Sequence, residues 1–192
     1  MKLIILALTL FVMPLLSKSQ GFKGGVIAGI NAAQIDGDTQ GGYKKIGFIA
    51  GAFVDYKISK KSFIEANFYY IGKGAVKNVE YAGGIVWQEF KTTLHYIEMP
   101  ISYSYRVMRQ FSLAAGLAPA YLFADRLVSI GTIISKSTYQ LSNFDFGISG
   151  QVEFYFPKNF SIELRVTRSL ISIRRDHFWL NNSLSFVGKY RF

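Results

Sequence analysis

The sequence is short of the residues that build enzyme and metal centres. It contains no cysteine and only two histidines among 192 residues. Without cysteine the chain gains no stability from disulfides and has no thiol chemistry. His95 and His177 stand in no spacing with acidic residues that resembles a ligand set, and Asp176 beside His177 is a weak signal for a dyad because neighbours on a strand point apart. We therefore expect no catalytic residues, no cofactor and no metal.

Long runs of one charge sign are also missing. Lys and Arg number 22 against 12 Asp and Glu, which gives a formal net charge of +10. No run of Lys and Arg is long enough to form a dedicated nucleic-acid patch, so we expect no nucleic-acid partner.

A long apolar run stands at the N-terminus. Met1 and Lys2 form a positive start, residues 3–16 an apolar core, and Ser17 and Ser19 supply small residues before a cleavage site. The run is too short for a membrane-spanning helix, which needs about 20 apolar residues. We predict a cleaved signal peptide at residues 1–19 and a single domain at residues 20–192.

The remaining chain is dominated by alternating segments rich in Tyr and Phe, a composition that favours strands over helices. The last segment places Leu184, Phe186, Tyr190 and Phe192 on one face and Ser183, Ser185, Lys189 and Arg191 on the other. We predict eight such strands, at residues 22–33, 45–56, 62–73, 90–106, 111–125, 141–156, 160–172 and 181–192.

The two faces of these strands differ in a way that predicts their surroundings. The face that carries the charges also carries Gly and Ser, which suits the narrow interior of an eight-stranded barrel. The runs of Phe, Ile, Val and Tyr on the other face are an aggregation hazard in water but match lipid. A soluble barrel with its charged face outward is the competing architecture. The composition favours an all-β, eight-stranded antiparallel up-and-down transmembrane β-barrel.

The connections between the strands alternate in length. Those at 58–61, 107–110 and 157–159 are short, and those at 34–44, 74–89, 126–140 and 173–180 are long. Transmembrane barrels have short periplasmic turns and longer outer loops. We therefore expect both termini in the periplasm and four loops at the cell surface.

The inward parity predicts a network of charges in the lumen, made of Glu65, Glu98, Arg106, Glu153, Glu163, Arg165, Lys189 and Arg191. We expect Glu98 to pair with Arg165, Arg106, Arg191 or Lys189, because an unpaired buried charge is too costly to keep. Pro100 cannot donate to a strand ladder, so it must lie at a bulge or near a rim. A gate or a binding carboxylate is the functional alternative to a plug of ion pairs.

Two of the long loops are apolar. Residues 79–87 have two apolar arms around Gly83 and Gly84, which predicts a hairpin that continues two strands above the membrane. Residues 127–134 are similarly apolar, and exposed apolar loops often mark partner sites. The candidate partner residues are Tyr81, Ile85, Trp87, Leu127, Ile130 and Ile133. Arg174, Arg175 and Lys136 can meet lipopolysaccharide phosphates.

Three stretches resemble the PorT-like family of small outer-membrane β-barrels of Gram-negative bacteria, also called porin family proteins. They are GFKGGVIAGIN at residues 21–31, LHYIEMPISY at residues 94–103 and VGKYRF at residues 187–192. The resemblance implies a place in the bacterial outer membrane, and it implies that Tyr190 and Phe192 form an insertion signal read by the barrel assembly machinery. One branch of the family is associated with protein secretion, and no catalytic set comes with it.

Two classes of function follow from these residues. The first is a structural or adaptor barrel that docks an envelope partner through its surface loops or its periplasmic rim. The second is a narrow passive channel, and an enzyme at the rim is a distant third. Because the interior of eight strands leaves little room beside long charged side chains, the adaptor is the favoured interpretation.

Overall fold

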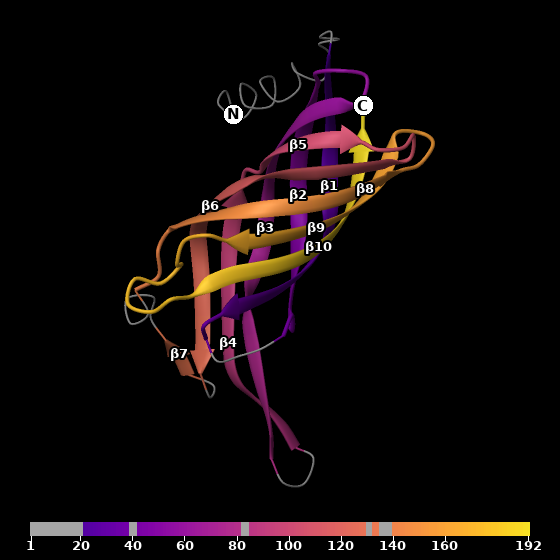
Figure 1. The fold of residues 1–192 in the computed structure, drawn as a ribbon. Helices are drawn as coiled ribbons and strands as arrows, with labels where there is room; N and C mark the ends of the chain where they lie inside the picture. The colour runs from indigo at the N-terminus through magenta and orange to yellow at the C-terminus, as the bar shows by residue number, and fades with distance from the viewer. Residues whose placement is uncertain (1–20, 39–41, 82–84, 130–131, 135–139) are drawn as a thin grey trace, which may run out of the picture.

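The computed structural model describes residues 21–38, 42–81, 85–129, 132–134 and 140–192, so the predicted signal peptide lies outside the described residues. Strands dominate this part of the chain (Figure 1). Their bounds are β1 Phe22–Asp36, β2 Lys45–Lys57, β3 Ser62–Tyr81, β4 Ile85–Glu98, β5 Ile101–Arg106, β6 Phe111–Ser129, β7 Thr132–Ile134, β8 Phe144–Tyr155, β9 Phe160–Ser169 and β10 Leu180–Arg191. No helix in the described ranges is long and apolar enough to cross a membrane.

The strands close into a ring of eight positions. β1 pairs antiparallel with β2 on one side and with β10 on the other, from Gly25 opposite Arg191 to Asp36 opposite Leu180. Both β4 and β5 pair with β3 and β6, so they fill one position together, and β7 is a short addition paired to β6. The prediction of an all-β, eight-stranded antiparallel barrel is confirmed.

The predicted strand at residues 90–106 is not continuous, because it breaks at Met99 and Pro100. Proline has no N–H for the ladder, as the sequence argument required. The pairing is kept on both sides of the break: Asn67 N donates to Pro100 O and Met99 N donates to Pro119 O, each over 2.9 Å. The break therefore divides one barrel strand into β4 and β5 without opening the wall.

Strands β1, β3, β4 and β6 run further toward the long loops than their sequence pattern predicted, whereas β8 and β9 stop about three residues short of it. β3 and β4 stay paired as far as Tyr81 opposite Ile85, and β6 extends to Ser129. The predicted hairpin is therefore present in the backbone, and its turn at 82–84 lies outside the described residues.

The two faces of the wall separate as predicted. Large apolar side chains point outward and are exposed, including Phe48 (70%), Phe186 (51%) and Leu164 (47%). Polar and charged side chains point inward and are buried. The inner face also holds two large apolar side chains, Ile49 and Phe53 of β2.

Aromatic side chains gather around one end of the barrel, which we call the short-turn end. It holds the three tight turns and the close of β10 (Figure 1). Ring pairs there include Phe22 with Tyr56 at 4.6 Å, Phe111 with Phe154 at 4.8 Å, and Tyr190 with Phe192 at 6.0 Å between centroids. Such a girdle suits the interface between lipid and water.

Candidate functional site: the charged lumen

The lumen is filled by a set of buried charges that we call the lumen network. Its carboxylates are Asp55, Glu65, Glu98, Asp145, Glu153 and Glu163, and its cations are Lys73, Arg165, Lys189 and Arg191. All of them come from alternate positions of the strands, which the two-residue period turns inward.

Lys189 stands at the centre of the network. Its Nζ lies 2.5 Å from Glu65 Oε2, 2.9 Å from Glu163 Oε2 and 3.5 Å from Glu153 Oε2. These three carboxylates approach one another closely enough to hold a metal ion. The ammonium group already lies among them, so this arrangement serves an ion-pair cluster and carries no separate argument for a metal.

Arg191 extends the network toward the short-turn end. Its Nε donates to Asp55 Oδ2 over 2.9 Å, and its Nη2 donates to Glu153 Oε1 over 2.6 Å. Its Nη1 donates to Ser161 Oγ over 2.6 Å. A guanidinium has five donors in a fixed fork, so one arginine can join strands β2, β8 and β9 at this level.

A chain of contacts continues from the centre toward the long loops. Arg165 Nη2 lies 2.6 Å from Glu163 Oε1, and Arg165 Nη1 donates to the Tyr69 hydroxyl over 2.6 Å. That hydroxyl donates to Glu98 Oε1 over 2.6 Å, and Lys73 Nζ lies 2.5 Å from Glu98 Oε2. The partner of Glu98 is thus Lys73, and none of the four cations expected from the sequence. Lys73 is closer because it lies on β3, the strand paired with the strand of Glu98.

Arg106 was expected in the network but lies apart from it, at the mouth of the lumen. Its guanidinium lies over the rings of Phe63 and Tyr155, 4.8 and 4.5 Å from their centroids. No described carboxylate lies within ion-pair distance of it, and its Nε is buried without a hydrogen-bond partner. Arg106 is the last residue of β5, and the nearby carboxylates Asp55, Glu65 and Glu153 are bound by Arg191 and Lys189.

Apolar side chains close the lumen at the end with the long loops. This apolar cap consists of Ile35, Leu94, Leu122, Leu127, Leu141, Ile173 and Trp179, each 7% exposed or less. Leu127 was expected in a partner-binding loop, which is wrong, because it is fully buried on β6. A β-bulge at Phe123, where the register with β4 shifts between His95 and Tyr96, reverses the facing of the residues that follow. Leu127 therefore points inward although Leu117 of the same strand points outward. Arg174 lies over the Trp179 ring, 4.7 Å from its centroid.

For the other predicted partner residues of the loops, the structure describes the backbone alone or nothing. Tyr81, Ile85 and Trp87 lie on the β3–β4 hairpin and Ile133 lies on β7, but their side chains lie outside the described residues. Ile130 and Lys136 lie outside them altogether. The sequence missed Phe178, which is 71% exposed in the fourth long loop.

Within the described residues, the contacts of the two histidines are with residues outside the lumen network. His95 has the outward parity, and its Nδ1 lies 2.7 Å from the Tyr70 hydroxyl. His177 Nδ1 lies 3.0 Å from Asp176 Oδ2. The sequence analysis expected these two side chains to point apart as neighbours on a strand, but both residues lie in a loop, where neighbours can meet. Two hydrogen bonds from Arg174 lower the pKa of Asp176 to about 2, which makes this carboxylate a partner of Arg174.

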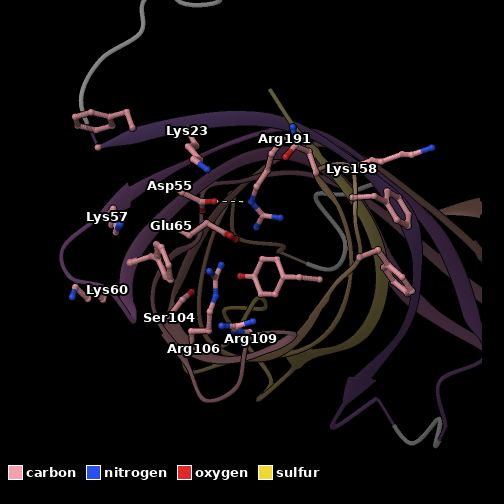
Figure 2. A pocket seen from close by; sticks show the side chains of 17 residues that line it. Lys23, Asp55, Lys57, Lys60, Glu65, Ser104, Arg106, Arg109, Lys158 and Arg191 are labelled. Atoms are coloured by element: carbon pink, nitrogen blue, oxygen red, sulfur yellow. Dashed lines mark hydrogen bonds and ion pairs between the residues drawn. The ribbon is translucent and has the colours of Figure 1, made fainter.

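A cavity of about 570 Å³ opens at the short-turn end of the lumen, next to Asp55, Glu65 and Arg191 of the lumen network. We call it the vestibule. Figure 2 looks into it and shows Asp55 bound to Arg191, with Lys23 and Arg106 extending toward its centre from opposite walls. The basic residues that line it are Lys23, Lys57, Lys60, Arg106, Arg109, Lys158 and Arg191, and the acidic ones are Asp55 and Glu65.

A scan against protein families identifies the architecture. A family model described as "Outer membrane protein beta-barrel domain" matches residues 17–175. The chain belongs to this family. No curated protein matches the sequence. Membership places the chain among the β-barrels of the bacterial outer membrane, so the outward apolar face is the face toward lipid.

Solved structures agree on the fold. The attachment invasion locus protein Ail of Yersinia pestis is 14% identical, with a TM-score of 0.53, over 91% of this chain and 100% of that chain. Neisserial surface protein A is 13% identical, with a TM-score of 0.57, over 90% of this chain and 98% of that chain. At these identities the likeness concerns the fold of this outer-membrane barrel alone.

Proposed function

We propose that this protein is a plugged outer-membrane barrel that acts as an adaptor, docking an envelope partner through its surface loops or its periplasmic rim. The observation that carries the proposal is the filling of the lumen. The network from Asp55 to Asp145 and the apolar cap up to Trp179 are buried in series along the axis. A channel for solutes needs a continuous water path, and the interior of eight strands is just wide enough for side chains to fill it.

The orientation of the adaptor follows from the lengths of the connections. The short-turn end faces the periplasm and the long loops face the cell surface, as in other barrels of the outer membrane. Phe178, at 71% exposure, is a side chain that a surface partner can bury. Arg175, exposed in the same loop, is placed to meet lipopolysaccharide phosphates.

We further propose that the chain belongs to the PorT-like family and takes part in protein secretion. This part of the proposal rests on the resemblance of residues 21–31, 94–103 and 187–192 to that family. In this proposal the chain is not an enzyme and binds no nucleic acid. The exposed Tyr190 and Phe192 at the end of β10 form the signal for the barrel assembly machinery.

Electrical recording from planar lipid bilayers tests the proposal against a passive channel. Purified protein without its signal peptide should show no steady conductance under conditions in which an open porin, used as the positive control, conducts. Uniform single-channel steps from the wild-type protein would replace the adaptor with a channel.

The partner is tested by cross-linking in native membranes followed by mass spectrometry. We expect a cross-linked envelope protein whose yield falls when Phe178→Ser removes the exposed ring. Phe48→Ser, on the lipid face, is the control at a similarly exposed phenylalanine. Equal yields from both variants would show that the fourth loop does not dock the partner.

A further inference from the structure

The vestibule is a cationic cup whose charges are only partly neutralised. Its two acidic residues are already occupied, because Asp55 accepts from Arg191 and Glu65 from Lys189. The remaining basic residues make no ion pair with a described carboxylate; they are Lys23, Lys57, Lys60, Arg106, Arg109 and Lys158. Like charges gathered around one cavity repel each other and raise the concentration of anions inside it.

The positive charge of Lys23 is not neutralised by Asp55, the acidic residue next to it on the neighbouring strand. It lies directly opposite Asp55 in the register of β1 and β2. Asp55, however, is bound by Arg191, so the Lys23 ammonium is left facing the cavity (Figure 2). The lumen network holds two more carboxylates than cations. This negative excess offsets only part of the positive charge of the basic residues that line the vestibule.

Arg106 is held in place without using its hydrogen-bonding capacity on a carboxylate. The rings of Phe63 and Tyr155 flank its guanidinium, and its Nε remains buried without an acceptor. Arginine suits bidentate binding of phosphate oxygens, and a guanidinium fixed between rings loses little freedom when it binds them. Arg109 lines the same wall and adds a second guanidinium.

The shape of the vestibule favours a small ligand. Its volume of about 570 Å³ falls within the range of small-molecule sites. The ion pairs of Lys189 and Arg191 close its inner end, and its charged lining residues come from inward positions and tight turns, so it opens to water along the barrel axis. A cup of this kind encloses a compact molecule better than it fits a flat protein surface.

We propose that the vestibule binds a small soluble polyanion that carries two or more phosphate groups, with Lys23 and Arg106 as its principal contacts. Lys57, Lys60 and Arg109 surround the entrance and draw the anion in. This site lies at the opposite end of the barrel from the loops that meet lipopolysaccharide. It requires neither the adaptor role nor the orientation in the membrane.

Calorimetric titration with inorganic tripolyphosphate tests the proposal, using the full barrel in a non-ionic detergent at 150 mM salt, close to physiological ionic strength. We expect saturable binding to the wild type and a loss of affinity of about tenfold or more when K23Q and R106Q are combined, since each removes a charge-assisted contact. K44Q combined with R175Q is the matched control, because it removes one Lys and one Arg from the other end. The control should bind like the wild type.

Four outcomes would overturn the proposal. They are no binding to the wild type, equal affinity in the vestibule and control variants, tighter binding of hexaglutamate than of tripolyphosphate, and weaker tripolyphosphate binding in nanodiscs that contain an anionic phospholipid. The third would assign the site to an acidic peptide and the fourth to a lipid headgroup. If R106Q prevents folding, K23Q combined with K57Q replaces it, because both of these lysine side chains are exposed.

Discussion

Lys73 and Glu98 form a buried ion pair between β3 and β4, with Lys73 Nζ 2.5 Å from Glu98 Oε2. Both side chains are 3% exposed or less. The pair lies between the two ends of the lumen network, because Tyr69 links Glu98 to Arg165 on one side and Lys73 approaches Asp145 to 3.8 Å on the other. Loss of either partner leaves a charge in a space that excludes water.

We expect Glu98→Ala to lower the free energy of unfolding by about 3 to 5 kcal/mol, because it leaves Lys73 buried without its nearest carboxylate. Urea titration of the protein in lipid vesicles, followed by tryptophan fluorescence, measures the change. Combining it with Lys73→Met should restore much of the loss, since the uncompensated charge is then gone. A double variant as unstable as the sum of the two single ones would show that the pair is not coupled.

The lipid face can be tested at Leu164, which is 47% exposed on β9. We expect Leu164→Arg to cost about 2 to 4 kcal/mol if the residue lies near the bilayer midplane. Leu164→Ala controls for the loss of the side chain without adding charge, and a polar change at the inward Ser149 should be mild. Equal losses for Leu164→Arg and Leu164→Ala would argue against contact with hydrocarbon.

The apolar cap predicts a different result at two leucines of the same strand. Leu127 is fully buried in the cap, whereas Leu117 is 50% exposed on the outer face of β6. We expect Leu127→Ala to cost about 2 to 5 kcal/mol, the range for a buried Leu that leaves a cavity. Leu117→Ala should cost less because lipid chains fill the space. If Leu127→Ala left the stability unchanged but weakened the complex with the partner, Leu127 would be a partner-binding residue and not part of the apolar cap.

The close of β10 predicts how the chain reaches the membrane. Tyr190 and Phe192 are 48% and 59% exposed, and their rings meet edge to face. We expect deletion of residues 190–192 to leave the protein in the periplasm, as measured by fractionation and immunoblotting. Phe192→Ala keeps the ion pairs of Arg191, so it separates a lost insertion signal from a damaged network. Normal outer-membrane levels of the deletion would contradict the role of these residues in insertion.

The sequence by itself determined the barrel, its two faces and an irregularity at Pro100, although not the division of the strand into β4 and β5. These features depend on local geometry: side chains alternate along a strand whatever it pairs with, and proline lacks an N–H wherever it stands. The pattern therefore separates Leu164 from Glu163 without knowledge of any neighbour. It also brings Glu65, Glu153, Glu163, Arg165, Lys189 and Arg191 to the lumen.

Only the tertiary structure decided which charges meet. Lys189 binds Glu65 across 124 positions of the chain, and Glu98 binds Lys73 where the sequence favoured four other cations. Such pairs depend on the stagger between strands and on the reach of each side chain across the closed ring, which no local pattern encodes. A β-bulge in β6 turns Leu127 into the cap, and the pairing of Asp55 with Arg191 leaves Lys23 facing the open vestibule.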